Sequence, residues 1–252
     1  MKNSVFELCV ESVDAARAGE IGGANRIELC SHLECGGITP EPELIAAVLE
    51  AVTIPVHILI RSRAGNFNFS AEEFKQMQRQ IDQAGQLGAC GVAVGVLCAD
   101  GRVDVERSRE LVRQSRPMRA TFHRAFDETP DLSEALEAVI QTGADCLLTS
   151  GGAADVLAGA EPIAQLYRQA GNRLNIMAAG GLRLSNLIRL VRQTGVSNIH
   201  GSLTERPPHA AGDQRDFAAM LEDDVREAVR LLRDEMKRRS GSEAAFSTAE
   251  KG

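Results

Sequence analysis

Residues 5–30 read VFELCVESVDAARAGEIGGANRIELC, and this stretch contains the pattern that the rest of the chain repeats. Two short apolar runs, residues 5–9 and 26–30, flank an amphipathic run over residues 12–20. The period of the apolar residues changes from strand-like to helical between them, and Gly22-Gly23 is typical of the left-handed turn after a helix. A strand, a helix and a second strand in this order predict a parallel β–α–β unit.

The same alternation occurs eight times along the chain. Strands are expected at residues 5–9, 26–30, 56–61, 91–95, 119–123, 145–149, 175–179 and 197–201. Helices are expected at residues 12–20, 42–51, 71–84, 105–114, 132–142, 162–169, 184–194 and 215–237. Eight parallel strands that each precede a helix predict a closed (β/α)₈ TIM barrel. An open doubly wound sheet is the competing arrangement, but it usually has a glycine-rich turn after the first strand, and residues 9–12 contain no glycine.

Length and composition agree with one soluble domain. A chain of 252 residues with 25% charged residues is of ordinary size for a single α/β barrel. We expect the barrel to occupy residues 1–239 and the small, polar residues 240–252 to form a disordered tail.

Charge and hydropathy argue against two classes of partner. The net charge is −7, and the basic residues between positions 226 and 239 alternate with acidic ones, which is typical of a solvated helix face rather than a nucleic-acid site. The N-terminus lacks the apolar segment of a signal peptide, and no run approaches the roughly 18 apolar residues of a membrane span. We therefore expect a cytoplasmic protein that binds neither nucleic acid nor membrane, with its six cysteines reduced.

The first two expected strands end in the same tripeptide pattern, Glu7-Leu8-Cys9 and Glu28-Leu29-Cys30. Side chains alternate along a strand, so each glutamate shares a face with its cysteine, and neighbouring strands lie about 5 Å apart. If that face is the barrel interior, two carboxylates and two thiols converge near the rim. A buried carboxylate is costly unless it is paired or coordinated, which favours function for the glutamates, whereas Cys9 and Cys30 could equally be small core residues.

The third strand ends at Arg61, on the same face as His57. Arg61 is the expected ion-pair partner of Glu7 or Glu28. The polar and glycine-containing segment at residues 62–70 is expected to form a loop over the mouth of the barrel, and His57, a strand length below the rim, is expected to be a core residue.

The fifth strand leads into the sequence TFHRAFD, residues 121–127, which is the densest ionisable cluster in the chain. A histidine at a strand end suits general acid–base catalysis, so His123 is a candidate for that role. Arg124 could bind an anion. Alternatively, Arg124 and Asp127 form an ion pair that holds the loop.

Small and glycine residues follow the sixth, seventh and eighth strands. TIM barrels often bind phosphate with backbone N–H groups of the last loops, although glycine there also permits tight turns. The predicted ligand-binding residues are Arg124, Thr149, Ser150, Gly180, Gly181, Gly201 and Ser202.

Several of these segments together resemble the CutC copper homeostasis family. They are residues 26–31 (RIELCS), 36–40 (GGITP), 121–127 (TFHRAFD) and 148–151 (LTSG), and the resemblance extends from about Phe6 to Ser202. It implies a barrel fold, cytoplasmic location, a homodimer, and binding of Cu(I) by the cysteines that match Cys9 and Cys30.

One loop departs from the family pattern. The family usually has Arg-Pro-Arg-Gly-Gly-Asp-Phe after the third strand, where this chain has RSRAGNF at residues 61–67. Asn66 replaces the family's acid, so a role that needs an anionic side chain at this position is not expected here.

Two functions from different classes follow. In the first, the chain binds copper, because soft thiolates suit Cu(I), with Cys35, Cys98 and His200 as further potential ligands of the Cys9 and Cys30 site. In the second, it is an enzyme that acts on a small anionic or phosphorylated metabolite by acid–base chemistry. The catalytic residues would then be Glu7, Glu28, Arg61 and His123. A scaffold with a degenerate site is a third and weaker reading.

Overall fold

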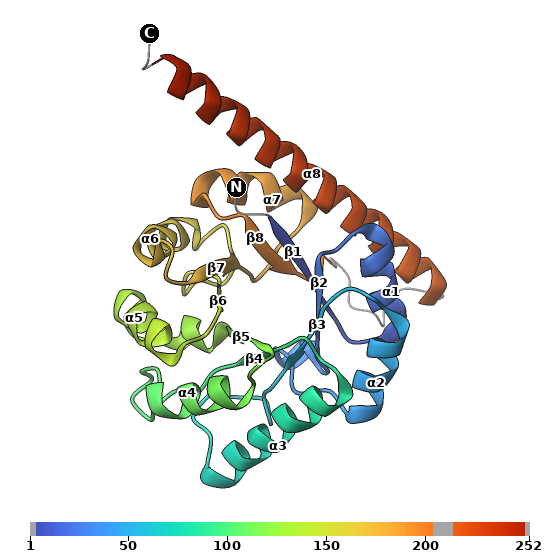
Figure 1. The fold of residues 1–252 in the computed structure, drawn as a ribbon, viewed down its shortest axis with the longest axis vertical. Coiled ribbons are helices and arrows are strands. Elements are labelled where there is room, and N and C mark those ends of the chain that lie inside the picture. Colours follow the sequence, from blue (N-terminus) through green and yellow to red (C-terminus); the bar gives the residue numbers. More distant parts are fainter. Residues whose placement is uncertain (1–3, 204–213, 250–252) are drawn as a thin grey trace.

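The chain forms a closed, eight-stranded parallel barrel in which each strand pairs with the next and β8 pairs with β1 (Figure 1). The computed structural model describes residues 4–203 and 214–249. The strands are β1 Val5–Val10, β2 Arg26–Leu29, β3 Val56–Leu59, β4 Gly91–Val94, β5 Arg119–Phe122, β6 Cys146–Thr149, β7 Asn175–Ala178 and β8 Asn198–Gly201. The predicted TIM barrel is therefore confirmed.

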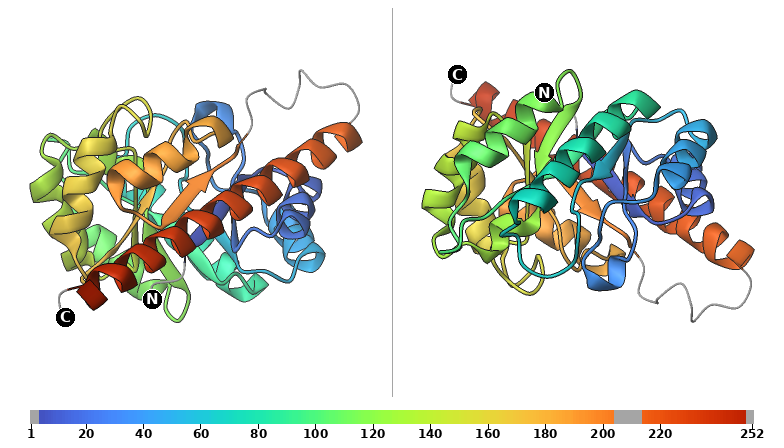
Figure 2. Two further views of the ribbon diagram at one scale, coloured as in Figure 1. Left: turned by 90° about the horizontal axis from the view of Figure 1, so that it is seen from above. Right: turned by 90° about the horizontal axis from the view of Figure 1, so that it is seen from below.

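Helices surround the barrel on its outside (Figures 1 and 2). They are α1 Val13–Gly22, α2 Pro42–Ala51, α3 Ala71–Leu87, α4 Val105–Gln114, α5 Leu132–Thr142, α6 Ala160–Ala170, α7 Leu184–Thr194 and α8 Gln214–Ala249. Two short 3₁₀ helices, η1 Leu33–Cys35 and η2 Arg124–Glu128, follow β2 and β5 at the end of the barrel where the strands finish. None of the helices in the described ranges combines the length and the hydropathy that crossing a membrane requires.

Strand alternation separates an apolar layer from a polar interior. The outward side chains of β1 and β2, among them Phe6, Leu8 and Ile27, belong to the main hydrophobic core between barrel and helices. The inward side chains include buried glutamates, histidines and thiols. The interior is thus a set of ionisable groups that must satisfy one another, because water is largely excluded.

Strand β4 contributes almost no side-chain volume to this interior. A Cβ atom on Gly91 would lie 2.4 Å from the ring of His57, and one on Gly95, which directly follows the strand, would lie 2.7 Å from the ring of His123. Together with Ala93 between them, these glycines leave room for the two imidazoles of the adjacent strands.

Helix α8 crosses the outside of the barrel and packs against α1 and α7 (Figure 2). The buried carboxylate of Glu235 accepts hydrogen bonds from Arg192 of α7 at 3.0 Å and from Arg238 at 2.6 Å, which ties the two helices together. Helix α8 runs on to Ala249, and the disorder expected for residues 240–252 stays a prediction. Alanines at positions 244, 245 and 249 favour helix, and no proline interrupts them. Residues 250–252 of that tail lie outside the described residues.

Close packing of α1 on α8 generates a prediction for Gly22. A Cβ at this position would lie 2.7 Å from both the backbone oxygen of Glu222 and Cβ of Val225. We expect Gly22→Ala to lower the free energy of unfolding by about 1–3 kcal/mol, as over-packing does, measured by urea denaturation. Gly241→Ala, in helix α8, is the control and should not destabilise, because its new Cβ would contact nothing within 4 Å. Equal loss in both variants would contradict tight packing at Gly22.

Candidate functional site

A cavity of about 300 Å³ opens where the strands end. Most of the predicted site residues line it: Cys9, Glu28, Cys30, Arg61, His123, Arg124, Gly180, Gly181, Gly201 and Ser202. Glu7, Thr149 and Ser150 are not among the described lining residues. The expectation of one shared cavity at this end of the barrel therefore holds for three of the four proposed catalytic residues, Glu28, Arg61 and His123.

The two thiols of the repeated Glu-x-Cys pattern lie in contact. Cys9 Sγ and Cys30 Sγ are 3.6 Å apart, and both residues are buried. The backbone N–H of Cys30 donates to the carbonyl of Val10, which places Cys30 diagonally across from Cys9. The spacing between the two strands therefore does not keep the thiols apart. Sharing a proton with Cys30 and burial both raise the pKa of the Cys9 thiol well above its usual range, so Cys9 is a neutral thiol at neutral pH.

Glu7 lies below the cavity, in the closed interior, and Arg61 is not its partner. Glu7 accepts hydrogen bonds from Arg26 at the start of β2 and from His200 Nδ1 on β8, the latter at 2.8 Å. Burial opposes its charge, but Arg26 and His200 outweigh that effect and hold the pKa of Glu7 well below its usual range. The expected pairing with Arg61 is wrong, because the parallel register places Glu7 beside Arg26 and His200 instead.

Glu28 and His200 connect this interior pair to the thiols. His200 Nε2 lies 3.7 Å from Glu28 Oε2, and one ligand atom from each of Cys9, Glu28 and His200 lies within 4.8 Å of the others. Burial raises the pKa of Glu28, which disfavours its charge. Burial acts against the charge of His200 too, but the carboxylates of Glu28 and Glu7 outweigh it, so the pKa of His200 is raised.

Arg61 lines the cavity but forms no ion pair with any carboxylate in the described ranges. It donates to three backbone carbonyls of the loops over the mouth, Cys35 at 3.2 Å, Gly37 at 2.8 Å and Gly65 at 2.7 Å. Its Nε is buried and has no hydrogen-bond partner among the described residues. Its guanidinium also stacks on Phe67, 4.6 Å from the ring centroid, so the segment at residues 62–70 does reach the mouth, as expected.

His123 lines the same cavity as Arg61 and is a neutral hydrogen-bond donor. Its Nδ1 accepts a hydrogen bond from Ala125 N at 3.2 Å, so the proton of the neutral ring is on Nε2. Burial, followed by the charge of Arg61, lowers the pKa of His123 to about 3. Nε2 is buried and has no partner in the described part of the chain. His57, as expected, is a core residue, and burial lowers its pKa to about 4.

Asp127 holds the loops after β5 and β6 together. It accepts hydrogen bonds from Arg124 Nε at 2.9 Å, Ser150 N at 2.9 Å, Gly152 N at 3.0 Å and the hydroxyl of Thr149. Thr149 and Ser150 are therefore supports for the loop and not lining groups, since their hydroxyls face Asp127. The ion pair of Arg124 with Asp127, the alternative raised for this segment, is present.

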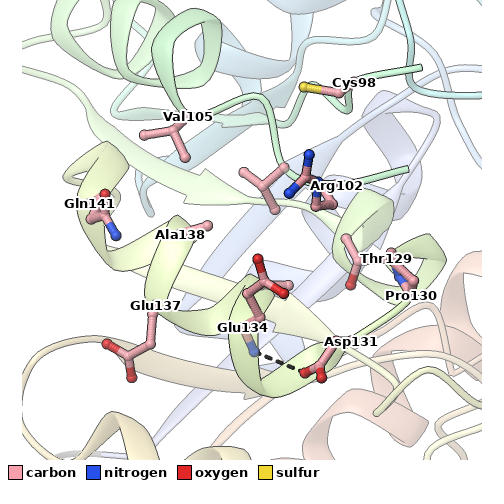
Figure 3. Close-up of a pocket in the computed structure, with 12 residues that line it drawn as sticks. Cys98, Arg102, Val105, Thr129, Pro130, Asp131, Glu134, Glu137, Ala138 and Gln141 are labelled. Atoms are coloured by element: carbon pink, nitrogen blue, oxygen red, sulfur yellow. Dashed lines mark hydrogen bonds between the residues drawn. The ribbon is translucent and has the colours of Figure 1, made fainter. Parts of the chain in front are cut away.

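The other potential metal ligands divide. His200 lies beside Cys9, and Cys35 is exposed on η1. Cys98 lies in a separate groove between the loop after β4 and helix α5 (Figure 3). That groove measures about 370 Å³. Of its charged groups, Arg102 pairs with Asp100, Glu137 pairs with Arg173, and Asp131 accepts the backbone N–H of Glu134 at 2.9 Å. The groove brings no set of potential catalytic groups together.

Two residues that support the site, Arg26 and Gly95, were not predicted from the sequence. Arg26, which neutralises Glu7, shares the inward face of β2 with Glu28, so alternation alone indicates its direction. Gly95 makes room for His123, and the pattern Gly91-x-Ala93-x-Gly95 is the signal of a strand that leaves the barrel interior open.

Comparison with known proteins gives consistent matches over most of the chain. The CutC family model matches residues 4–205. A family protein CutC of Caulobacter vibrioides is 43% identical over 206 residues, which are 82% of this chain and 84% of that protein. One from Bacteroides fragilis is 41% identical over 206 residues, 81% of this chain and 82% of that protein. A crystal structure of a candidate copper homeostasis protein CutC from Streptococcus agalactiae aligns with a TM-score of 0.74 and 28% identity, covering 80% of this chain and 100% of that one.

The loop contacts of Asp127 predict a large effect on stability. We expect Asp127→Ala to lower the free energy of unfolding by about 3 kcal/mol, because several buried donors lose a charged acceptor at once. Urea denaturation would measure it. The control is Asp100→Ala, whose carboxylate is exposed and paired with Arg102. The denaturation midpoint of that variant should hardly change, and a similar midpoint loss in the two variants would show that Asp127 is no special support.

The buried histidines predict a pH dependence. The pKa of His123 is about 3 in the folded protein and near 6.5 when exposed, so only the unfolded chain takes up this proton as the pH falls from 6.5 to 3. The contribution of His123 to the free energy of unfolding is therefore fully present above pH 6.5, and it is lost as the pH falls from 6.5 to 3. In NMR titrations the imidazole of His123 should not titrate between about pH 5 and pH 8. A midpoint near neutrality would contradict the buried, neutral donor.

Proposed function

The chain belongs to the CutC family, and we propose that its function within that family is to bind Cu(I) through the thiols of Cys9 and Cys30. The observation that carries the proposal is the contact of two buried thiols, 3.6 Å apart, on the wall of an open cavity. Copper is the cargo of such a protein. Its assembly as a dimer and its location in the cytoplasm stay predictions.

The donor set fits a soft monovalent ion. Thiolate sulfur is the ligand that Cu(I) prefers, and the two sulfur atoms lie close enough together for one ion to bind both. Each thiol must lose its proton on binding, so metal uptake releases protons. The hydrogen bond with Cys30 and burial beside Leu33 and Leu59 raise the pKa of the Cys9 thiol, so that Cys9 is neutral in the empty site.

A harder donor set overlaps this pair. Cys9, Glu28 and His200 offer sulfur, oxygen and nitrogen atoms within 4.8 Å of one another. Such a mixture suits Zn²⁺ better than Cu(I). The two ligand sets share Cys9 and differ in the second residue, so Cys30 and Glu28 are the positions that distinguish them.

Metal binding can be tested without interference from surface thiols. The parent for the test is the variant with Cys35, Cys90 and Cys98 all changed to Ser, which removes the exposed cysteines. Reduced protein should bind one equivalent of Cu(I) in competition with a chelator. Cys30→Ser should weaken binding by at least about a hundredfold, because one of two soft ligands is lost.

Two matched variants sharpen the result. Cys146→Ser removes another buried thiol, on β6 outside the cavity, and should leave the affinity unchanged. Glu28→Gln should weaken Cu(I) binding little. Full Cu(I) affinity in the Cys9→Ser/Cys30→Ser double variant would show that the thiol pair is not the site. A large loss of affinity in Glu28→Gln with none in Cys30→Ser would assign the site to the mixed donor set instead.

A further inference from the structure

Arg61 is a cation buried without a counter-ion. Only 6% of its surface is exposed, and none of the described carboxylates lies within ion-pair distance of it. Buried arginines are rare in proteins unless they are paired, because loss of water around the charge is costly. The three loop carbonyls that Arg61 binds offset part of this cost but carry no negative charge. The buried charge therefore calls for an anion from outside the described chain.

His123 provides a second unsatisfied donor at the same wall. The Nε2–H bond is buried, with 4% of the residue exposed, and it has no acceptor within the described ranges. A buried donor without an acceptor costs about 1–3 kcal/mol, so a site that keeps one is expected to meet an acceptor in use. A neutral imidazole cannot act as a counter-ion, but it can donate to an oxygen atom.

The two donors form one structural unit. Phe67 contacts both, with the Arg61 guanidinium 4.6 Å and the His123 ring centroid 5.1 Å from the centroid of its ring. All three residues line the cavity at the strand ends. A Cβ atom on Gly95 would lie 2.7 Å from the His123 ring, so the imidazole packs closely against the backbone at this position. The orientation of both donors is thus determined before any ligand arrives.

The remaining charges of the cavity favour an anion too. Arg183 lines the mouth without an ion pair to any described residue, whereas Arg124, which reaches the mouth from the loop after β5, is paired with Asp127. His200 on the far wall lies beside the carboxyl groups described above. The protein as a whole carries a net charge of −7, so a cavity edged by guanidinium groups stands out from its surroundings and draws anions inward.

We propose that the wall formed by Arg61, Phe67 and His123 binds the oxyanion of a small metabolite, a carboxylate or a phosphate group. The arginine supplies the charge and the histidine supplies a directed N–H donor, which together recognise oxygen rather than a halide. A cavity of about 300 Å³ admits only a small molecule, and its other end reaches Glu28 and the thiols. The site does not depend on copper, since it uses none of the residues assigned to the metal.

Binding can be measured on metal-free, reduced protein by isothermal titration calorimetry. The probes are methyl phosphate for the phosphate class and acetate for the carboxylate class, at constant ionic strength in sodium chloride. We expect saturable binding of at least one probe in the millimolar range or tighter, and the tighter of the two identifies the class. The Cys9→Ser/Cys30→Ser double variant should bind the same probe with unchanged affinity, which separates this site from the proposed copper site.

Two substitutions of one residue isolate the donor. His123→Asn keeps an acceptor for Ala125 N but removes the donor at Nε2, and we expect it to weaken binding about tenfold. His123→Gln keeps an N–H donor near the position of Nε2 and should stay within about threefold of the parent. Arg61→Lys, which retains the charge but loses the planar fork, should weaken binding about tenfold. Arg102→Gln, in the separate groove, is the control for unspecific attraction.

The outcomes are decisive in both directions. Loss in His123→Asn with retention in His123→Gln and Arg102→Gln supports the site, and thermal denaturation of each variant establishes that it is folded. In the parent, the Nε2–H resonance of His123 should also shift when the probe is added. The proposal is overturned if the unsubstituted, metal-free protein shows no saturable binding of either probe, or if His123→Asn binds the probe with the same affinity as that protein. Either result would count even if copper binds as proposed.

Discussion

The charge of Glu7, at the centre of the barrel, persists only because cations lie beside it. Its neighbours across the parallel ladders are position 26 in β2 and position 200 in β8, and both supply a basic side chain. The guanidinium of Arg26 and the imidazole of His200 therefore pair with Glu7 inside the barrel. Arg61, whose side chain also points inward, is left with backbone carbonyls alone. The charge pattern at the mouth therefore follows from how one buried carboxylate is neutralised.

The cavity has two walls of different chemistry. On the side of β1, β2 and β8, the contact between Cys9 and Cys30 offers soft sulfur donors. On the side of β3 and β5, Arg61 and His123 offer N–H groups that suit oxygen atoms. The walls come from different strands and use different residues, so the proposed metal binding and the proposed anion binding can be tested separately by mutation. The copper function proposed above uses the first wall, and the local hydrogen-bond pattern points to a use for the second.

Residues that touch no ligand determine how well these walls are positioned. Asp127 collects donors from two loops and so holds Arg124 and the segment after β6 at the mouth. Gly95 leaves space for the His123 ring at the cavity wall. Supports of this kind are required wherever a donor must be oriented before the ligand arrives. They also explain why Thr149 and Ser150, predicted as ligand contacts, act through Asp127 instead.

Local pattern alone determined the barrel, because the switch between the strand and helix periods recurs eight times and parallel strands with intervening helices have few ways to pack. It also determined that Glu28, Cys30 and His123 point inward at the strand ends, since alternation along a strand is a local property. The partner of each charge was decided by tertiary structure. Register between strands, which no single strand encodes, placed Arg26 and not Arg61 beside Glu7 and brought two thiols from separate strands into contact. Ion pairs and ligand sites depend on distances across the barrel, and those distances exist only once the chain has closed on itself.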